Sequence, residues 1–187
     1  MNRINKYIRP CIILVDPCST SSVLAKEFDK RGYDCISLIS RIKIPEVFAS
    51  SYQPDDFLFE IRYKNNIEEV LSTLSDVPIT VVISCLETSV FLADTIAERL
   101  GLPGNNPKTS RLRRDKYQMI EAVRRRGLKA AWQKVFSVTQ DAVSWINQKE
   151  FPVVIKPLRS AGTDSVFICN SIVQVEEACN TMIKSQK

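Results

Sequence analysis

Two lysines and a loop of small residues are the part of this sequence best suited to chemistry. Lys116 lies in Arg114-Asp-Lys-Tyr117, and Lys156 ends the apolar run Phe151-Pro-Val-Val-Ile-Lys. A strand-end ammonium beside small side chains favours a phosphate, because backbone N–H groups in such a loop can approach an anion closely. The expected phosphate site therefore combines both lysines with the loop residues Ser160, Ala161, Gly162, Thr163 and Asp164.

The same residues also have simpler interpretations. Lys116 falls four positions after Leu112 and four before Ile120 on an expected helix, so its stem could pack while its ammonium reaches water. Lys156 could simply leave a buried strand at its end, and Gly162 suits an ordinary hairpin turn. Taken one by one, the residues leave these alternatives open.

Composition excludes several classes of chemistry. The chain contains no histidine, so it offers no Ser-His-Asp or Cys-His nucleophile. Its five glycines form neither the dinucleotide nor the P-loop fingerprint. Six cysteines without a C-x-x-C pair argue against zinc and disulfide frameworks. Four of them lie in apolar runs and are expected to be buried, reduced thiols of a cytoplasmic protein, namely Cys11, Cys35, Cys85 and Cys169.

Apolar runs such as Cys11–Val15 are too short to span a membrane or to act as a secretory signal, so neither is expected.

Positive charge is concentrated in one segment. Residues 108–134 carry ten Lys/Arg against Asp115 and Glu121, a local charge of +8, while the whole chain carries +5. The rest of the chain is therefore at −3, and a phosphate-bearing partner is expected near the basic segment. Nucleic acid is a weaker alternative, because Tyr117 is the lone aromatic residue between Arg111 and Arg126.

Strand and helix patterns alternate over residues 1–107. Expected strands cover Tyr7–Val15, Asp34–Ile39, Phe57–Ile61 and Ile79–Ser84. Expected helices run from Val23 toward Gly32, over Ile67–Leu74 with an Asn65/Glu68 capping box, and over Thr88–Leu100 before Gly101. This alternation predicts an α/β domain with a doubly wound parallel sheet, which ends at the turn Leu102–Pro107.

After residue 107 the expected strands and helices no longer alternate in this way. Residues 108–127 are expected to be a linker containing one helix, Ser110–Arg126, ended by Gly127. Residues 128–187 predict a small α+β lobe with antiparallel strands and helices on one face. Its expected elements are a short strand near Val135–Phe136, a helix Thr139–Gln148, strands Val153–Lys156 and Val166–Cys169, and a helix opened by Ser171 with Gln174 three residues later.

In three features this sequence resembles the ATP-grasp family of carboxylate–amine ligases. These features are a lysine on a linker helix, a lysine at the end of a strand, and a loop of small residues after that strand. Within that family, the L-amino-acid ligase and carbamoyl-phosphate-synthase-like branch is the most similar. The resemblance implies that residues 1–107 are a pre-ATP-grasp domain and residues 128–187 the first ATP-grasp lobe of an incomplete ATP-grasp domain. It further implies that Lys116, Lys156 and the loop from Ser160 to Asp164 contact the phosphates of ATP.

The resemblance covers the front part of such an enzyme. The family's second lobe and its Mg²⁺ ligands would lie beyond Lys187, so this chain is expected to contribute phosphate-binding residues to a ligase without being competent alone. The complete enzyme would form an acyl phosphate from a carboxylate and pass it to an amine. Cys18 and Glu87 stand in turns where the family often has glycine, which makes a substrate role for Glu87 doubtful.

A non-catalytic nucleotide-binding or protein-interaction module derived from such an enzyme is the alternative function. A partner or a second copy of the chain would then cover the exposed edge where the missing lobe would dock, with Val175, Ala178 and Met182 as candidate contacts.

Overall fold

The computed structural model describes residues 9–41, 44, 46–146, 151–159 and 165–185. The chain divides into two units, Met1–Arg111 and Leu112–Lys187, each with its own hydrophobic core.

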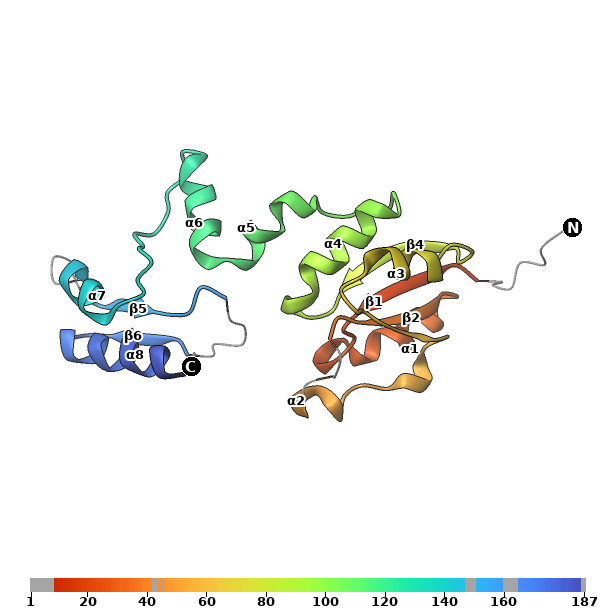
Figure 1. Ribbon diagram of the computed structural model, residues 1–187, viewed down its shortest axis with the longest axis horizontal. Coiled ribbons are helices and arrows are strands. Elements are labelled where there is room, and N and C mark those ends of the chain that lie inside the picture. Colours follow the sequence, from red (N-terminus) through yellow and green to blue (C-terminus); the bar gives the residue numbers. More distant parts are fainter. Residues whose placement is uncertain (1–8, 42–43, 45, 147–150, 160–164, 186–187) are drawn as a thin grey trace, which may run out of the picture. The chain divides into compact units, whose positions relative to one another are not determined.

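A four-stranded parallel sheet forms the centre of the first unit (Figure 1). Its strands are β1 (Cys11–Val15), β2 (Asp34–Ile39), β3 (Glu60–Arg62) and β4 (Ile79–Ser84), arranged in the order β3-β2-β1-β4. The predicted parallel α/β sheet is confirmed. The third strand begins three residues later than expected, because Phe57 closes the 3-10 helix η2 (Pro54–Asp56) and Ser37 pairs with Glu60.

Strand β1 is buried on both faces, as its continuous apolar sequence predicts. Cys11, Ile13 and Val15 point into a cluster with residues of α3 (Ile67–Thr73) and α4 (Val90–Arg99). Ile12 and Leu14 point to the other side, where they pack with Ala25 and Phe28 of α1 (Leu24–Asp29). The sheet is therefore sandwiched between α1 on one face and α3 with α4 on the other (Figure 1).

Helix boundaries in this unit follow local capping chemistry. Gly101 has φ +66° and its N–H donates to Glu98, while the N–H of Leu102 donates to Ala97, which ends α4 where the sequence predicts. The predicted cap of α3 is wrong by one residue. The side chain of Asn66, not Asn65, accepts from the N–H groups of Glu68 and Glu69. Three short helices complete the unit, η1 (Ser19–Val23), α2 (Glu46–Ala49) and η3 (Glu87–Ser89), and η4 (Pro107–Thr109) follows them.

The single linker helix expected over Ser110–Arg126 is wrong, because two helices occupy this segment. Helix α5 (Ser110–Arg114) stops before Asp115, and α6 (Lys116–Arg125) begins after it. Asp115 adopts an extended conformation, with φ −97° and ψ 111°, and its side chain caps α6. Aspartate competes with the helix for backbone N–H groups, and this accounts for the break. The predicted stop at Gly127 is confirmed, with φ +74°.

The second unit is a small α+β lobe, as predicted. Strands β5 (Val153–Ile155) and β6 (Phe167–Cys169) pair antiparallel, with Val154 opposite Ile168. Helices α7 (Thr139–Ile146) and α8 (Ile172–Ser185) pack on one face of this pair. Ser171 accepts from the N–H of Gln174, so the predicted start of α8 is also confirmed.

Two expectations for this unit fail. Residues 128–138, all of them described, form no strand at Val135–Phe136; the ring of Phe136 instead packs 5.7 Å from that of Trp145. Val175 and Ala178 are 0% and 3% exposed inside the core of this lobe, so they are unavailable as the proposed docking edge. Helix α8 turns these two residues toward α7 and the strands because they lie at i and i+3.

No helix in the described part of the chain is both long and apolar enough to cross a lipid bilayer. All six cysteines are free thiols; Cys11, Cys35 and Cys169 are buried as expected, whereas Cys85 is half-buried.

Candidate phosphate-binding site

Asp115 organises the start of helix α6. It is 5% exposed, and its Oδ1 accepts hydrogen bonds from the N–H groups of Tyr117 at 3.1 Å and Gln118 at 3.0 Å. An N-cap of this kind satisfies two of the N–H groups that a helix leaves unpaired at its start. The residue that directly follows the cap is Lys116, which is half-buried. The cap thus fixes the backbone at the start of α6 and, with it, the point from which the Lys116 side chain extends.

A backbone hydrogen bond joins the segment after β5 to the start of α6. The N–H of Lys116 donates to the carbonyl oxygen of Leu158 at 3.1 Å. Lys156 stands two residues before Leu158. Since consecutive Cα atoms are about 3.8 Å apart, the Cα atoms of the two lysines lie within about 15 Å of each other. Two lysine side chains can reach a common triphosphate over this separation.

An ion pair supports the same junction. Nε of Arg159 lies 3.7 Å from Oδ2 of Asp115, the carboxylate oxygen that does not cap the helix. The arginine side chain is 59% exposed, so the energy of this pair is screened by solvent. Asp115 thereby contacts both the helix and the segment after β5, and it holds the two lysine-bearing segments together.

The N-terminus of α6 is not itself an anion site. Its first three N–H groups, from Lys116, Tyr117 and Gln118, already donate to Leu158 and Asp115. A phosphate at this junction would therefore need side-chain donors. The side-chain donors near this junction are the ammonium groups of Lys116 and Lys156 and the guanidinium of Arg159.

Lys156 continues the exposed side of the two-stranded sheet. Val153 and Ile155 pack into the lobe's core, whereas Val154 is 53% exposed and its partner Ile168 is 69% exposed. Because side chains alternate along a strand, Lys156 follows on the same side as Val154, and it is exposed. One face of the sheet therefore presents an apolar strip that leads to an ammonium group.

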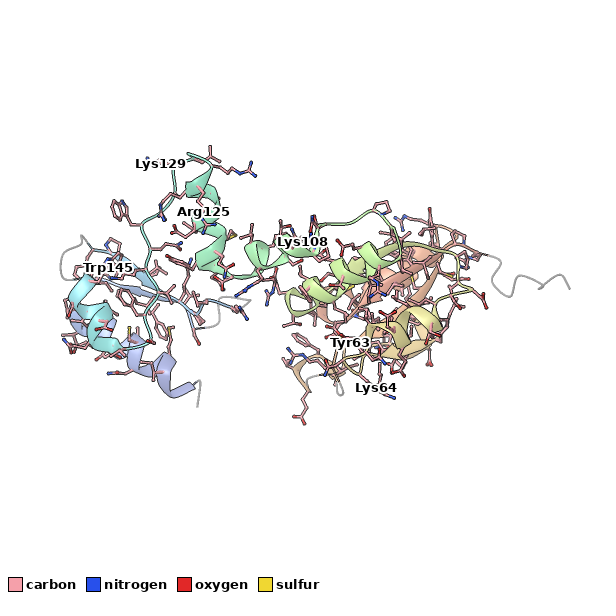
Figure 2. The ribbon with its side chains drawn as sticks, turned by 45° about the horizontal axis from the view of Figure 1, so that its top comes forward. Tyr63, Lys64, Lys108, Arg125, Lys129 and Trp145 are labelled. Atoms are coloured by element: carbon pink, nitrogen blue, oxygen red, sulfur yellow. The ribbon has the colours of Figure 1, made fainter. Side chains whose placement is uncertain are left out.

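The remaining basic residues of α6 lie at its other end. Arg124 pairs with Glu121, whose carboxylate also accepts from Nε2 of Gln133 at 3.0 Å. The hydrogen bond from Gln133, which has the larger effect, and the one from Arg124 lower the pKa of Glu121. Arg125 and Lys129 lie in the last turn of α6 and just beyond it (Figure 2). Their charges suit the helix dipole and do not belong to the Asp115 junction.

The predicted loop residues Ser160, Ala161, Gly162, Thr163 and Asp164 lie outside the described residues. Among the residues that are described, no group of three or more His, Cys, Asp or Glu side chains is arranged to hold a metal ion. Among the described residues of the junction, the carboxylate is that of Asp115, which already accepts from the helix and pairs with Arg159.

Asp115 is the residue that the sequence interpretation missed. The signal was present, since Asp115 followed by Gln118 three positions later has the spacing of a capping box. It was overlooked because the arginines on one side and the apolar residues on the other extend a helical pattern across it. The carbonyl of Leu158 had no sequence signal.

Comparisons with known proteins agree with this architecture. No family model matches the chain. Dapdiamide A synthase of Enterobacter agglomerans is 32% identical over 176 residues, which is 92% of this chain and 41% of that protein. An L-amino acid ligase from Bacillus licheniformis superposes with a TM-score of 0.71 at 14% identity, over 97% of this chain and 43% of that one. An ADP complex of N5-carboxyaminoimidazole synthetase from Staphylococcus aureus gives 0.68 at 18% identity, over 99% and 47%.

The chain spans less than half the length of each of these relatives. Its two units match the N-terminal part of ATP-grasp enzymes in fold. The chain belongs to the ATP-grasp ligase family.

Proposed function

We propose that this chain supplies the phosphate-binding residues of an ATP-dependent carboxylate–amine ligase. Lys116 and Lys156 would hold the phosphates of ATP, and on sequence grounds the proposal extends to the loop from Ser160 to Asp164. The observation that carries the proposal is the 3.1 Å hydrogen bond from Lys116 to Leu158, because it brings two lysines 40 residues apart to one junction.

The open face of the two-stranded sheet suits the adenine ring. Val154, two residues before Lys156, and its cross-strand partner Ile168 form an exposed apolar pair. A planar base would bury this pair, and its phosphates would extend toward the two lysines. Burial of aliphatic surface and charge-assisted hydrogen bonds would then act on opposite ends of one ligand.

In the proposed reaction, ATP supplies the phosphoryl group that activates a carboxylate toward an amine. The task of the two lysines is to neutralise phosphate charge as it shifts during transfer. Mg²⁺ normally accompanies ATP in such chemistry. The described residues provide no cluster of metal ligands, so no metal-binding role is assigned to any of them. The relatives' names, dapdiamide A synthase and L-amino acid ligase, support amide-bond formation as the class of reaction.

Nucleotide binding by the chain tests this proposal. Isothermal titration calorimetry with Mg²⁺ present should show saturable binding of ATP and ADP. AMP should bind at least about tenfold more weakly, because it lacks the phosphates that the lysines would hold. Equal affinity for AMP and ATP, or no saturable binding of ATP, would contradict the proposed phosphate site.

A further inference from the structure

A basic segment with exposed apolar side chains begins in α6 and continues past its C-terminal end. Residues 122–140 contain five lysines and arginines and no aspartate or glutamate. The same segment carries four large apolar side chains that are well exposed, namely Leu128 at 63%, Trp132 at 84%, Val135 at 43% and Val138 at 52%. Exposed apolar side chains that gather in one place, with polar residues around them, are typical of an interaction surface.

Contacts with the rest of the second unit hold this segment in place. Nε2 of Gln133, the residue after Trp132, donates to the carbonyl oxygen of Tyr117 in α6 at 2.8 Å. The ring of Phe136 packs 5.7 Å from that of Trp145 in α7. Trp132 therefore projects from a backbone that is attached to α6 on one side and to α7 on the other.

Exposed cations accompany the apolar side chains. Arg125 and Arg126 lie at the end of α6, and Lys129 and Lys134 follow beyond it; all four are exposed. Figure 2 shows Arg125 and Lys129 in this region. Among the described residues, no carboxylate forms an ion pair with any of these four. Positive charge that is not balanced within the protein attracts an anionic partner.

The apolar side chains distinguish between anionic partners. Single-stranded nucleic acid stacks its bases on several flat rings, whereas residues 122–140 expose the ring of Trp132 beside aliphatic Leu128, Val135 and Val138. The centre of a protein–protein interface is depleted of lysine. A lipid surface suits both kinds of side chain, because aliphatic groups enter the acyl boundary, tryptophan lies at the headgroup level, and lysine and arginine contact lipid phosphates.

We propose that residues 122–140 form a docking surface for an anionic lipid membrane. Leu128 and Trp132 would enter the interfacial layer, and Arg125 and Lys129 would contact the lipid headgroups. Binding would be peripheral and reversible, because it uses a few apolar side chains and electrostatic attraction. The proposal concerns the second unit and does not depend on the nucleotide role proposed above.

Vesicle binding by the full chain tests the proposal. Vesicles of phosphatidylcholine with about 30% phosphatidylserine should bind at least about tenfold more tightly than vesicles of phosphatidylcholine alone. The emission of Trp132 should shift to shorter wavelength, whereas Trp145, already packed against Phe136, should contribute little to the shift. Salt at about 0.5 M should weaken binding, because it screens the charges. No binding to the anionic vesicles, or equal binding to both kinds, would overturn the proposal.

A pair of variants tests the apolar contact. Trp132→Ala should reduce vesicle affinity at least about tenfold, because the indole ring would no longer be buried in the interfacial layer. The protein should stay folded, since Trp132 is 84% exposed. Phe91→Ala is the control, because Phe91 is 59% exposed but lies on α4 in the first unit. Unchanged affinity in Trp132→Ala, or an equal decrease in both variants, would refute this location.

A second pair tests the charges. Arg125→Ala combined with Lys129→Ala should reduce affinity for anionic vesicles roughly 30-fold, which corresponds to about 1 kcal/mol for each cation near such a surface. Lys64→Ala combined with Lys108→Ala removes the same charge from exposed positions of the first unit and should have little effect (Figure 2). Equal decreases in the two double variants would mean that net charge alone governs binding, and would contradict a defined surface.

Two other occupants of this surface give different results. Binding of a poly(U) oligonucleotide more tightly than of anionic vesicles at the same salt would assign the surface to nucleic acid. A dimer in sedimentation velocity that Trp132→Ala dissociates would assign it to a second copy of the chain. Either result would overturn the proposal. Lys156→Ala should leave vesicle affinity unchanged, so the membrane and nucleotide proposals can fail independently.

Discussion

Replacing Lys156 by alanine is expected to weaken ATP binding by roughly 10- to 150-fold, as follows from the loss of about 1.5–3 kcal/mol for a hydrogen bond to a charged group. The decrease in affinity should depend on the phosphates of the ligand. In the proposed site the base contacts Val154 and Ile168, whereas Lys156 lies beyond this apolar pair and contacts the phosphates. Calorimetry with ATP, ADP and AMP measures it. AMP affinity, already low, should change little.

Lys129→Ala is the matched control for this variant. Lys129 is exposed and lies just beyond the C-terminal end of α6, away from the Asp115 junction (Figure 2). Its loss removes one positive charge from the same unit without touching the proposed site. An equal decrease in ATP affinity in both variants would mean that general electrostatic attraction, not contact by Lys156, governs binding.

Asp115→Ala is expected to destabilise the second unit by about 1–2 kcal/mol and to weaken ATP binding. The substitution removes the cap of α6 and leaves the partly buried N–H groups of Tyr117 and Gln118 without their acceptor. It also frees Arg159 and loosens the junction that holds Lys116 beside Leu158. Urea unfolding followed by the fluorescence of Trp132 and Trp145, the two tryptophans of the chain, both in this unit, measures the stability change.

Two further variants separate the roles of Asp115. Asp115→Asn keeps a capping oxygen and loses the charge that faces Arg159, so it should cost less than the alanine variant. Asn66→Ala removes a comparable cap from α3 in the first unit and should leave ATP binding unchanged. If Asp115→Ala proves as stable as the unmodified chain, the junction does not depend on this residue.

Much of the first unit follows from its sequence. Strands β1, β2 and β4 are runs of β-branched and apolar residues, and glycines at positions 101 and 127 end helices because their positive φ angles suit no other residue as well. Strand β3 was misplaced because its bounds depend on pairing with Ser37 in β2, and such pairing is a tertiary effect.

The sites were predictable to different degrees. Sequence reasoning selected Lys116 and Lys156, but it placed Lys116 within a continuous helix and missed the break at Asp115. The contact that brings their segments together uses the backbone carbonyl of Leu158, which no side-chain pattern encodes.

Affinity labelling with adenosine diphosphopyridoxal would show whether Lys116 and Lys156 face the same bound nucleotide. The aldehyde of this ATP analogue forms an imine with a lysine near the terminal phosphates, and borohydride reduces that imine to a stable amine. Peptide mapping should find the label on Lys116 and Lys156, and excess ATP should prevent it. Label confined to other lysines, such as Lys129 and Lys134, or label that ATP does not prevent, would contradict a shared phosphate site at the junction of α6 and β5.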